Sequence, residues 1–268
     1  MSHSPLGTRP RQRQRWAHVE SARDVEVLAW IARFQFVTLD VLAARFEVSV
    51  ARAGVRVRRL EQLGYVRRVT GLVSQAHAIY LAPAGARHIG SPRRRAPRPS
   101  LQRDHELALT QLVCRLELAR PDPEVLTERD ARQRECDGDQ RFSVDVRAEH
   151  GGTAKRWPDV TLTNGRRTVA LEVEFAAKGT ERLRRIIEAY IASPMAEARF
   201  FVIDPVVAGR IARLRRDLLV AFGTSGARLC KIEIVPWTTV TAETRERIIK
   251  KVEVPGSSRG WDTSPRDR

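Results

Sequence analysis

Segment 157–178 constrains the fold more than any other part of the chain. Two short runs of alternating apolar and polar residues, starting at Asp159 and at Thr168, flank the pair Asn164-Gly165. Alternation with period 2 is typical of a strand. An Asn-Gly pair between two such runs predicts a tight hairpin turn with positive φ at both central residues. We therefore expect a β-hairpin here.

Acidic residues share one face of this hairpin. Glu172 and Glu174 alternate with the apolar residues Val169, Leu171 and Val173, so the two glutamates point away from the apolar face and lie beside the strand that starts at Asp159. Three carboxylates this close raise one another's pKa and cost free energy unless a cation or solvent compensates. A divalent ion such as Mg²⁺ is one such cation, because proteins usually hold it by one or two carboxylates plus waters and substrate phosphate.

Charge is distributed unevenly along the chain. The 268 residues leave room for about two domains. The formal net charge is +16, and residues 1–100 hold 18 arginines against six acidic residues. Coding bias in a GC-rich genome explains the choice of arginine over lysine, but not the net positive charge. The asymmetry favours a polyanionic partner that contacts the first third of the chain. Nucleic acid is the first candidate for this partner, and an anionic membrane is the second.

Cysteine usage and hydropathy indicate the compartment. Cys114, Cys136 and Cys230 are far apart and form no paired motif, which is typical of reduced thiols and predicts neither a disulfide framework nor a zinc site. The first residues carry positive charge without the apolar core of a secretory signal. No apolar run approaches the roughly 18 residues of a membrane span. We expect a soluble, cytoplasmic protein with no membrane partner.

The first third of the chain predicts a compact helical module. Residues 1–20 lack periodicity and predict a disordered basic arm. Apolar spacing and capping residues then predict helices over 25–32, from Thr38 to Phe46 and from Ser49 to Leu63, strands over 65–69 and 78–81, and a short helix after residue 82. The sequence Arg59-Leu-Glu-Gln-Leu-Gly-Tyr-Val66 resembles the end of the recognition helix and the start of the wing in winged helix-turn-helix domains. Residues 21–90 are therefore expected to bind double-stranded DNA.

Arginines follow the outer face of the third predicted helix. Arg52, Arg56 and Arg59 lie away from its apolar side, where guanidinium groups reach guanine edges and phosphates in a major groove. Arg67 and Arg68 lie at the base of the predicted wing and are expected to contact the flanking backbone. The alternative interpretation is a solvated helix face on a winged helix that binds protein.

A second domain follows a linker. Residues 91–101 are rich in Pro and Arg and predict that linker, residues 102–251 predict the domain, and residues 252–268 predict a disordered tail. The predicted elements are a helix from 104, a strand over 124–128, a weak strand over 142–146, the hairpin, helices over 183–191 and 207–218, and strands over 199–204 and 231–235. Segment 129–152 otherwise has no clear pattern. We expect an α+β or α/β domain, a mixed sheet with helices on both faces.

The acidic hairpin in this order of elements resembles the PD-(D/E)XK nuclease-like superfamily. The resemblance implies that Asp159 and Glu172 bind Mg²⁺ or Mn²⁺, which orients water at a scissile phosphate. Glu174 stands where the superfamily usually has lysine, and Lys178, four residues further on, is the candidate replacement. Glu106 and Glu128 are further candidate acids. The alternative for the three hairpin acids is an exposed polar strand face, and for Lys178 and Glu106 a solvated surface.

Taken from about Val25 to Val235, the motif order resembles the replication-relaxation proteins of plasmids and integrative elements. It consists of a winged helix, then Asp104-His-Glu-Leu, then Pro-Asp159, and finally Leu171-Glu-Val-Glu-Phe-Ala-Ala-Lys178. The resemblance implies replication initiation or mobilisation of such an element, with replication or mobilisation proteins as partners. It leaves open whether the second domain cuts or nicks DNA or only binds it.

Other classes of function require catalytic residues or surface properties that differ from those above. A tyrosine relaxase needs a histidine cluster and a nucleophilic tyrosine, but the six histidines are scattered and the three tyrosines read as core. The main alternative is a non-enzymatic winged-helix transcriptional regulator, a homodimer for example, whose second domain dimerises or senses a ligand. A third is a protein-interaction adaptor, which predicts no DNA affinity beyond that of a generic basic protein.

Overall fold

The computed structural model describes residues 21–70, 77–91, 103–119, 122–165, 167–175, 179–223 and 230–237. The predicted basic arm, the predicted tail and nearly all of the predicted linker lie outside these residues, as does Lys178. No helix in this part of the chain combines the length and the apolar character that crossing a lipid bilayer requires.

Residues 21–91, which we call the N-terminal module, form the predicted helices and strands, although the Thr38 side chain makes no capping hydrogen bond at the start of α2. The elements are α1 (Ala22–Ala32), α2 (Leu39–Arg45), α3 (Val50–Gln62), β1 (Val66–Val69), β2 (Ala78–Leu81) and α4 (Pro83–His88). Ser21 and Asp24 form a capping box at the start of α1, and the Ser49 side chain accepts a hydrogen bond from the Arg52 N–H at the start of α3. Gly64 ends α3 with φ of +75°. β1 and β2 pair antiparallel.

The larger sheet is mixed. Its strands are β3 (Glu124–Thr127), β6 (Val160–Thr163), β7 (Thr168–Glu174), β8 (Glu197–Val202) and β9 (Lys231–Pro236), in that order. The pairs β3–β6 and β6–β7 are antiparallel, whereas β7–β8 and β8–β9 are parallel. The protein is thus an α+β protein with a mixed sheet.

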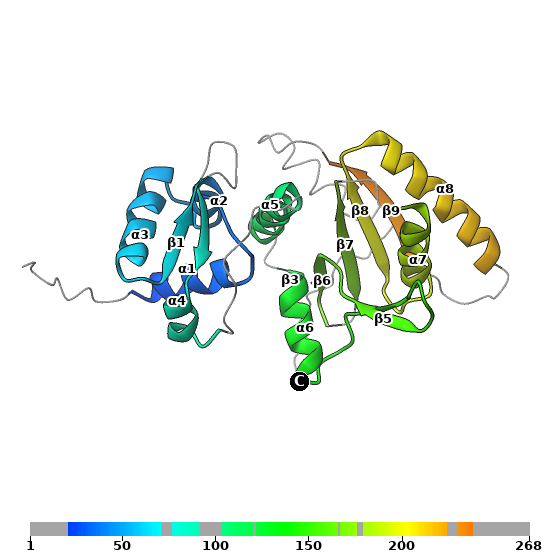
Figure 1. Ribbon diagram of the computed structural model, residues 1–268, viewed down its shortest axis with the longest axis horizontal. Coiled ribbons are helices and arrows are strands. Elements are labelled where there is room, and N and C mark those ends of the chain that lie inside the picture. The colour runs from blue at the N-terminus through cyan, green and yellow to red at the C-terminus, as the bar shows by residue number, and fades with distance from the viewer. Residues whose placement is uncertain are drawn as a thin grey trace, which may run out of the picture.

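Helices cover both faces of this sheet (Figure 1). On one face, Leu171 and Val173 belong to an apolar cluster with α5 (Arg103–Ala119). On the other, Ala170 and Phe200 pack with α7 (Thr180–Ile191) and α8 (Pro205–Phe222). Alternate residues of β7 therefore enter different cores, which confirms the alternation predicted for this strand.

Segment 128–156 contains a helix and a hairpin that the sequence pattern did not indicate. α6 (Glu128–Cys136) begins directly after β3, at a capping box formed by Thr127 and Asp130. It buries only Ala131, so it has no apolar stripe to detect. β4 (Val144–Arg147) pairs antiparallel with β5 (Thr153–Arg156) in a separate ribbon. β4 overlaps the weakly alternating segment 142–146, whereas β5 is mostly exposed and has no apolar face.

The turn of the acidic hairpin differs from the expected two-residue type. The strands end at Thr163 and resume at Thr168, so the loop is longer than an Asn-Gly turn. Gly165 has φ of +80° as expected. Asn164 acts through its side chain instead, because its Oδ1 accepts a hydrogen bond of 2.8 Å from the Arg167 N–H.

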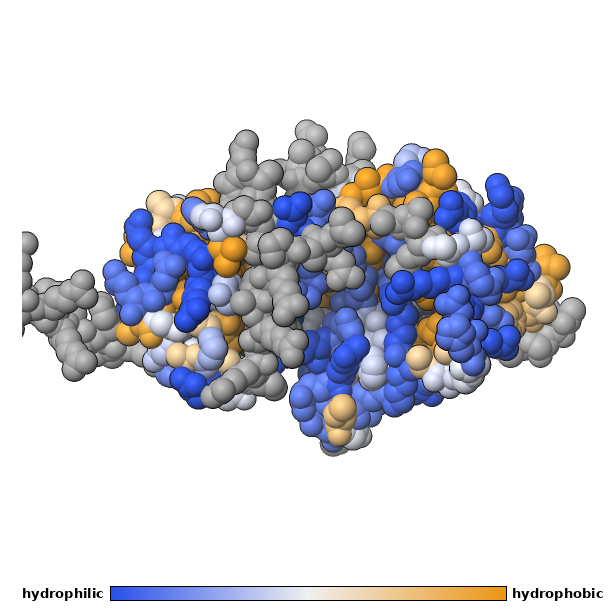
Figure 2. All heavy atoms as spheres, viewed as in Figure 1, coloured by the Kyte–Doolittle hydropathy of each residue, from blue (hydrophilic) through white to orange (hydrophobic). Residues whose placement is uncertain are grey.

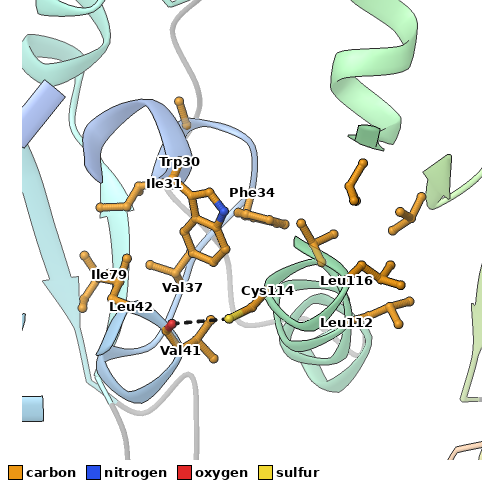
Figure 3. Close-up of a cluster of buried hydrophobic side chains, with 14 of the residues drawn as sticks. Trp30, Ile31, Phe34, Val37, Val41, Leu42, Ile79, Leu112, Cys114 and Leu116 are labelled. Carbon is orange, nitrogen blue, oxygen red and sulfur yellow. Dashed lines mark hydrogen bonds between the residues drawn. The ribbon is translucent and has the colours of Figure 1, made fainter. Parts of the chain in front are cut away.

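Helix α5 joins the N-terminal module to the sheet. Figure 3 shows Cys114 of α5 pointing to Val41 of α2, on the side where Trp30, Phe34 and Val37 lie, whereas Leu112 and Leu116 point to the other side of α5. All of these residues belong to one apolar cluster. Polar contacts border it: Glu117 accepts hydrogen bonds from the Trp30 indole at 3.0 Å and from Arg33 and Arg45. The apolar cluster runs without interruption from α1 through α5 to β7, so the two parts share one core.

Candidate functional site

Two of the arginines predicted to contact DNA, Arg56 and Arg59, form ion pairs with Asp24 of α1. The Asp24 carboxylate is 1% exposed and lies 2.8 Å from Arg56 Nη1 and 3.6 Å from Arg59 Nη2. Burial alone would raise the pKa of Asp24, but hydrogen bonds from Ser21 and the charges of Arg56 and Arg59 outweigh it and lower the pKa. Arg56 and Arg59 therefore neutralise a buried acid and hold α3 against α1.

The surface of α3 that remains open carries other side chains. Arg52, Val55 and Arg58 are exposed, with Val55 at 59%. Arg67 is exposed on β1, whereas Arg68 pairs with Glu61 at 2.7 Å. The exposed arginines of α3 and β1 are thus Arg52, Arg58 and Arg67, which we call the arginine face.

Arg58 was missing from the residues predicted to contact DNA. The buried residues Ala53, Val57 and Leu60 define the inner side of α3, and Arg58 projects from the rest of the helix circumference. Asp24 has a local role as the acid of the capping box of α1, so no sequence signal indicated that it would also pair with Arg56. Its burial in the folded protein is what requires the cations of α3.

Glu172 is neutralised by protein groups. Its side chain is 1% exposed, and one oxygen lies 2.6 Å from Arg156 Nη2 on β5. The other oxygen accepts a hydrogen bond from the Tyr190 hydroxyl on α7. The pKa of Arg156 is raised, first by the charge of Glu172, and the pKa of Tyr190 is raised well above its ordinary value by burial and by Glu172. Glu172 therefore belongs to a closed ionic cluster between the sheet, β5 and α7.

Asp159 stabilises the backbone at the junction of β6 and β7. Its Oδ2 accepts a 2.9 Å hydrogen bond from the Val173 N–H, beyond the last paired residues of β6, and a 3.1 Å hydrogen bond from His105 Nε2 on α5. Burial acts to raise the pKa of Asp159, but His105, the Val173 N–H and Arg156 outweigh it and lower the pKa. Arg156 thus interacts electrostatically with both predicted metal ligands.

These donors fit a divalent ion poorly. Asp159 and Glu172 approach a common cation, but that cation is the guanidinium of Arg156. Within the described residues, no three or more His, Cys, Asp and Glu side chains form a group that could hold a metal ion. The expected Mg²⁺ or Mn²⁺ would have to displace Arg156 from Glu172, and we derive no reaction step through it.

Three further predicted acids lie in the described part of the chain. Glu174 is buried on the same side of β7 as Glu172. Glu106 accepts a hydrogen bond from Gln35 at 3.2 Å, and Glu128 pairs with Arg132 at 2.6 Å on the surface of α6. Lys178 is not among the described residues.

A basic cavity of about 450 Å³ opens beside Asp159. It is lined by α6, the β4–β5 ribbon and the start of α7, and Figure 2 shows hydrophilic side chains over much of the face that carries β5, α6 and α7. Six cationic and three acidic side chains line it: Arg132, Arg147, Lys155, Arg156, Arg182 and Arg185, and Glu128, Glu149 and Asp159. Segment 129–152, which had no assignment from sequence, thus builds much of this cavity.

Glu135 holds the β4–β5 ribbon against α6. Its carboxylate accepts hydrogen bonds from the backbone N–H groups of Phe142 and Ser143, and from the side chains of Ser143, Lys155 and Trp157, all between 2.8 and 3.1 Å. Burial acts to raise the pKa of Glu135, but these hydrogen bonds outweigh it and lower the pKa to about 2. One partly buried carboxylate therefore fixes the ribbon that forms a wall of the cavity.

The low pKa of Glu135 predicts a pH-dependent stability. Because the folded state lowers the pKa from 4.5 to about 2, the carboxylate stabilises the fold fully above pH 4.5 and loses this contribution as the pH falls towards 2. Glu135→Gln should therefore lower the free energy of unfolding at pH 7 by roughly 2 kcal/mol. Chemical denaturation at pH 7 and pH 3 should give a smaller difference between variant and parent at pH 3. An equal difference at both values would contradict this role.

Comparisons with protein families, with curated proteins and with solved structures give no match to this chain. The resemblance to replication-relaxation proteins and to PD-(D/E)XK nucleases therefore stays a prediction from motif order.

Sequence reasoning also missed His105, Arg156 and Tyr190. Tyr190 was correctly placed in the core from its position on the apolar stripe of α7, but its hydroxyl donates to Glu172, as buried tyrosines commonly do. Arg156 stands three residues before Asp159, on a strand that no alternation reveals. A buried glutamate at position 172 was the available signal, because such a group requires a cation or a donor nearby.

Proposed function

We propose that the protein binds double-stranded DNA through its N-terminal module, used as a winged helix. The module has the elements that such a domain needs: three helices, the third following a short connection from the second, and a two-stranded ribbon directly after the third. In this class the third helix enters the major groove and the ribbon lies along the flanking backbone. The order and lengths of these elements support the assignment.

The observation that carries the proposal is the arginine face. Arg52 and Arg58 project from the open side of α3 and Arg67 from β1, so three guanidinium groups face solvent from the two elements that would meet DNA. Two acidic side chains of the module are neutralised by other arginines, since Asp24 pairs with Arg56 and Glu61 with Arg68. A surface of this sign attracts phosphates and releases counterions on binding.

The second domain is proposed to bind and not to cut DNA. Arg156 and Tyr190 already compensate Glu172, and Asp159 supports the backbone of Val173, so both predicted metal ligands have structural partners. Supercoiled DNA incubated with Mg²⁺ should stay intact. Nicking by the parent protein that Asp159→Ala abolishes would instead identify an enzyme. The pairing of Glu172 with Arg156 equally suits the regulator hypothesis, which differs in predicting symmetric dimers on palindromic DNA.

Removal of the arginine face tests the proposal. The triple substitution Arg52→Ser, Arg58→Ser and Arg67→Ser should weaken binding to duplex DNA by roughly a hundredfold or more, because each phosphate or base contact contributes about a factor of ten. Fluorescence anisotropy with a labelled duplex measures the affinity.

A matched control separates local contacts from net charge. Arg213 and Arg216 are exposed on α8, far along the chain from the module, and Arg213→Ser with Arg216→Ser should change the affinity no more than twofold to threefold. If the two variants lose the same amount of affinity per positive charge removed, the protein attracts DNA only as a generic polycation.

A further inference from the structure

Two clefts in the described part of the chain differ in the charges that line them. The larger, of about 590 Å³, lies between the N-terminal module and α6, and three arginines and three acids line it. Ion pairs connect these groups, such as Arg45 with Glu117 at 2.5 Å and Arg33 with Asp130 at 2.8 Å. The cavity of about 450 Å³ beside Asp159 has twice as many cations as acids. Of these two clefts in the described part of the chain, the second combines open volume with an excess of positive charge.

Half of the cations that line the basic cavity have no carboxylate partner among the described residues. Arg132, Lys155 and Arg156 pair with Glu128, Glu135 and Glu172 respectively. By contrast, the hydrogen bonds of Arg185 go to the backbone carbonyls of Glu181 and Arg147. The side chains of Arg147 and Arg182 are exposed and take part in no ion pair within the described residues.

The walls of the cavity are fixed before any ligand arrives. The guanidinium of Arg132 lies 4.4 Å from the ring centroid of Trp157, whose indole N–H donates to Glu135 at 3.1 Å. Arg185 links α7 to the β4–β5 ribbon through the Arg147 carbonyl at 3.2 Å. Arg185, held in this way, loses little conformational entropy when a ligand binds, which favours affinity.

We propose that this cavity is a second nucleic-acid contact, where Arg147, Arg182 and Arg185 bind phosphate groups of the backbone. Guanidinium groups suit this ligand, because their planar array of donors matches phosphate oxygens and stays charged at every physiological pH. The inference rests on the proposed function in naming DNA as the polyanion. It adds a site in the second domain, built by elements other than those of the arginine face.

Two contacts on one chain would raise affinity through effective concentration. Once the N-terminal module is bound, the second contact becomes intramolecular, so even weak phosphate contacts count. The N-terminal module and the sheet share a continuous apolar core, which limits how far the two contacts can move relative to each other. DNA should therefore be held at two places by a single protein molecule.

The test removes two cations that pair with no acid among the described residues. Arg147→Ala with Arg182→Ala should lower the affinity for duplex DNA about tenfold at an ionic strength of about 0.1 M, and should reduce the slope of log affinity against log salt by about two. Arg213→Ala with Arg216→Ala removes the same charge from α8 and should leave the slope within about half a unit of the parent. If the slope of log affinity against log salt is unchanged in the Arg147 and Arg182 variant, the proposal of a second contact is overturned. If the arginine-face variant still loses binding in that case, the proposed function of the N-terminal module remains intact.

A second measurement does not depend on DNA binding. Inorganic pyrophosphate, compared with chloride at equal ionic strength, should raise the Tm of the parent by a few degrees through binding to the folded state. The Arg147 and Arg182 variant should show less than half of this shift, and its Tm in chloride serves as the control for folding. An equal shift in both proteins would show that the cavity does not bind phosphate groups, whatever the DNA experiment gives.

Discussion

Replacing Arg156 by methionine should lower the free energy of unfolding by about 3–5 kcal/mol, because it leaves a buried carboxylate without its cation. Glu172 is 1% exposed, and Tyr190 offers only one hydrogen bond to it. Methionine keeps most of the volume of the aliphatic part of arginine. The lost free energy of unfolding therefore comes from the charge and not from packing. Urea denaturation followed by circular dichroism measures the difference.

The second partner supplies the control for this result. In the double variant Arg156→Met with Glu172→Gln, no unpaired charge remains and the Tyr190 hydroxyl still has an acceptor, so at least half of the lost stability should return. A single substitution that costs less than about 1 kcal/mol would mean that Glu172 is not held by Arg156, and would reopen the position to a metal ion.

Leu112→Ala should cost about 3–4 kcal/mol and should destabilise both parts of the molecule together. Leu112 lies fully buried on α5, in the apolar cluster that continues from α1 to β7. Because the cavity left by the substitution lies in a shared core, hydrogen exchange should become faster in α3 and in β7 alike. Leu219→Ala on α8, where the side chain is 36% exposed, is the control and should cost less than about 1 kcal/mol.

Faster exchange confined to α3, with β7 unaffected by Leu112→Ala, would contradict the shared core. The two parts would then be independent domains joined by a helix, and the fixed spacing between the two proposed DNA contacts would be lost.

Most of the fold could be predicted because local patterns agreed with the tertiary structure. The alternation around Leu171 assigned each residue of β7 to the correct face, since the strand is buried on both sides by helices. Capping by Ser49 marked the start of α3. In these segments propensity, hydrophobic period and capping all indicated the same element.

The β4–β5 ribbon and α6 could not be predicted because ionic contacts with distant residues stabilise them. The five hydrogen bonds to Glu135 replace the apolar stripe that a sequence pattern could detect. The same reason explains the candidate site: the spacing of Asp159 and Glu172 indicated two acids in one neighbourhood, but nothing local indicated that Arg156 would compensate them. Pairing between residues on different strands is a tertiary property, which a single sequence leaves open.

The most direct test of the central claim, that the N-terminal module reads duplex DNA, is a footprint of the full chain on a pool of duplexes with salt titrated from low to physiological strength. Our account predicts a protected duplex segment, with affinity that falls steeply as salt rises and contacts that vanish when Arg52, Arg58 and Arg67 are replaced. Absence of protection at the lowest salt, or protection that survives the loss of these three arginines, would contradict it.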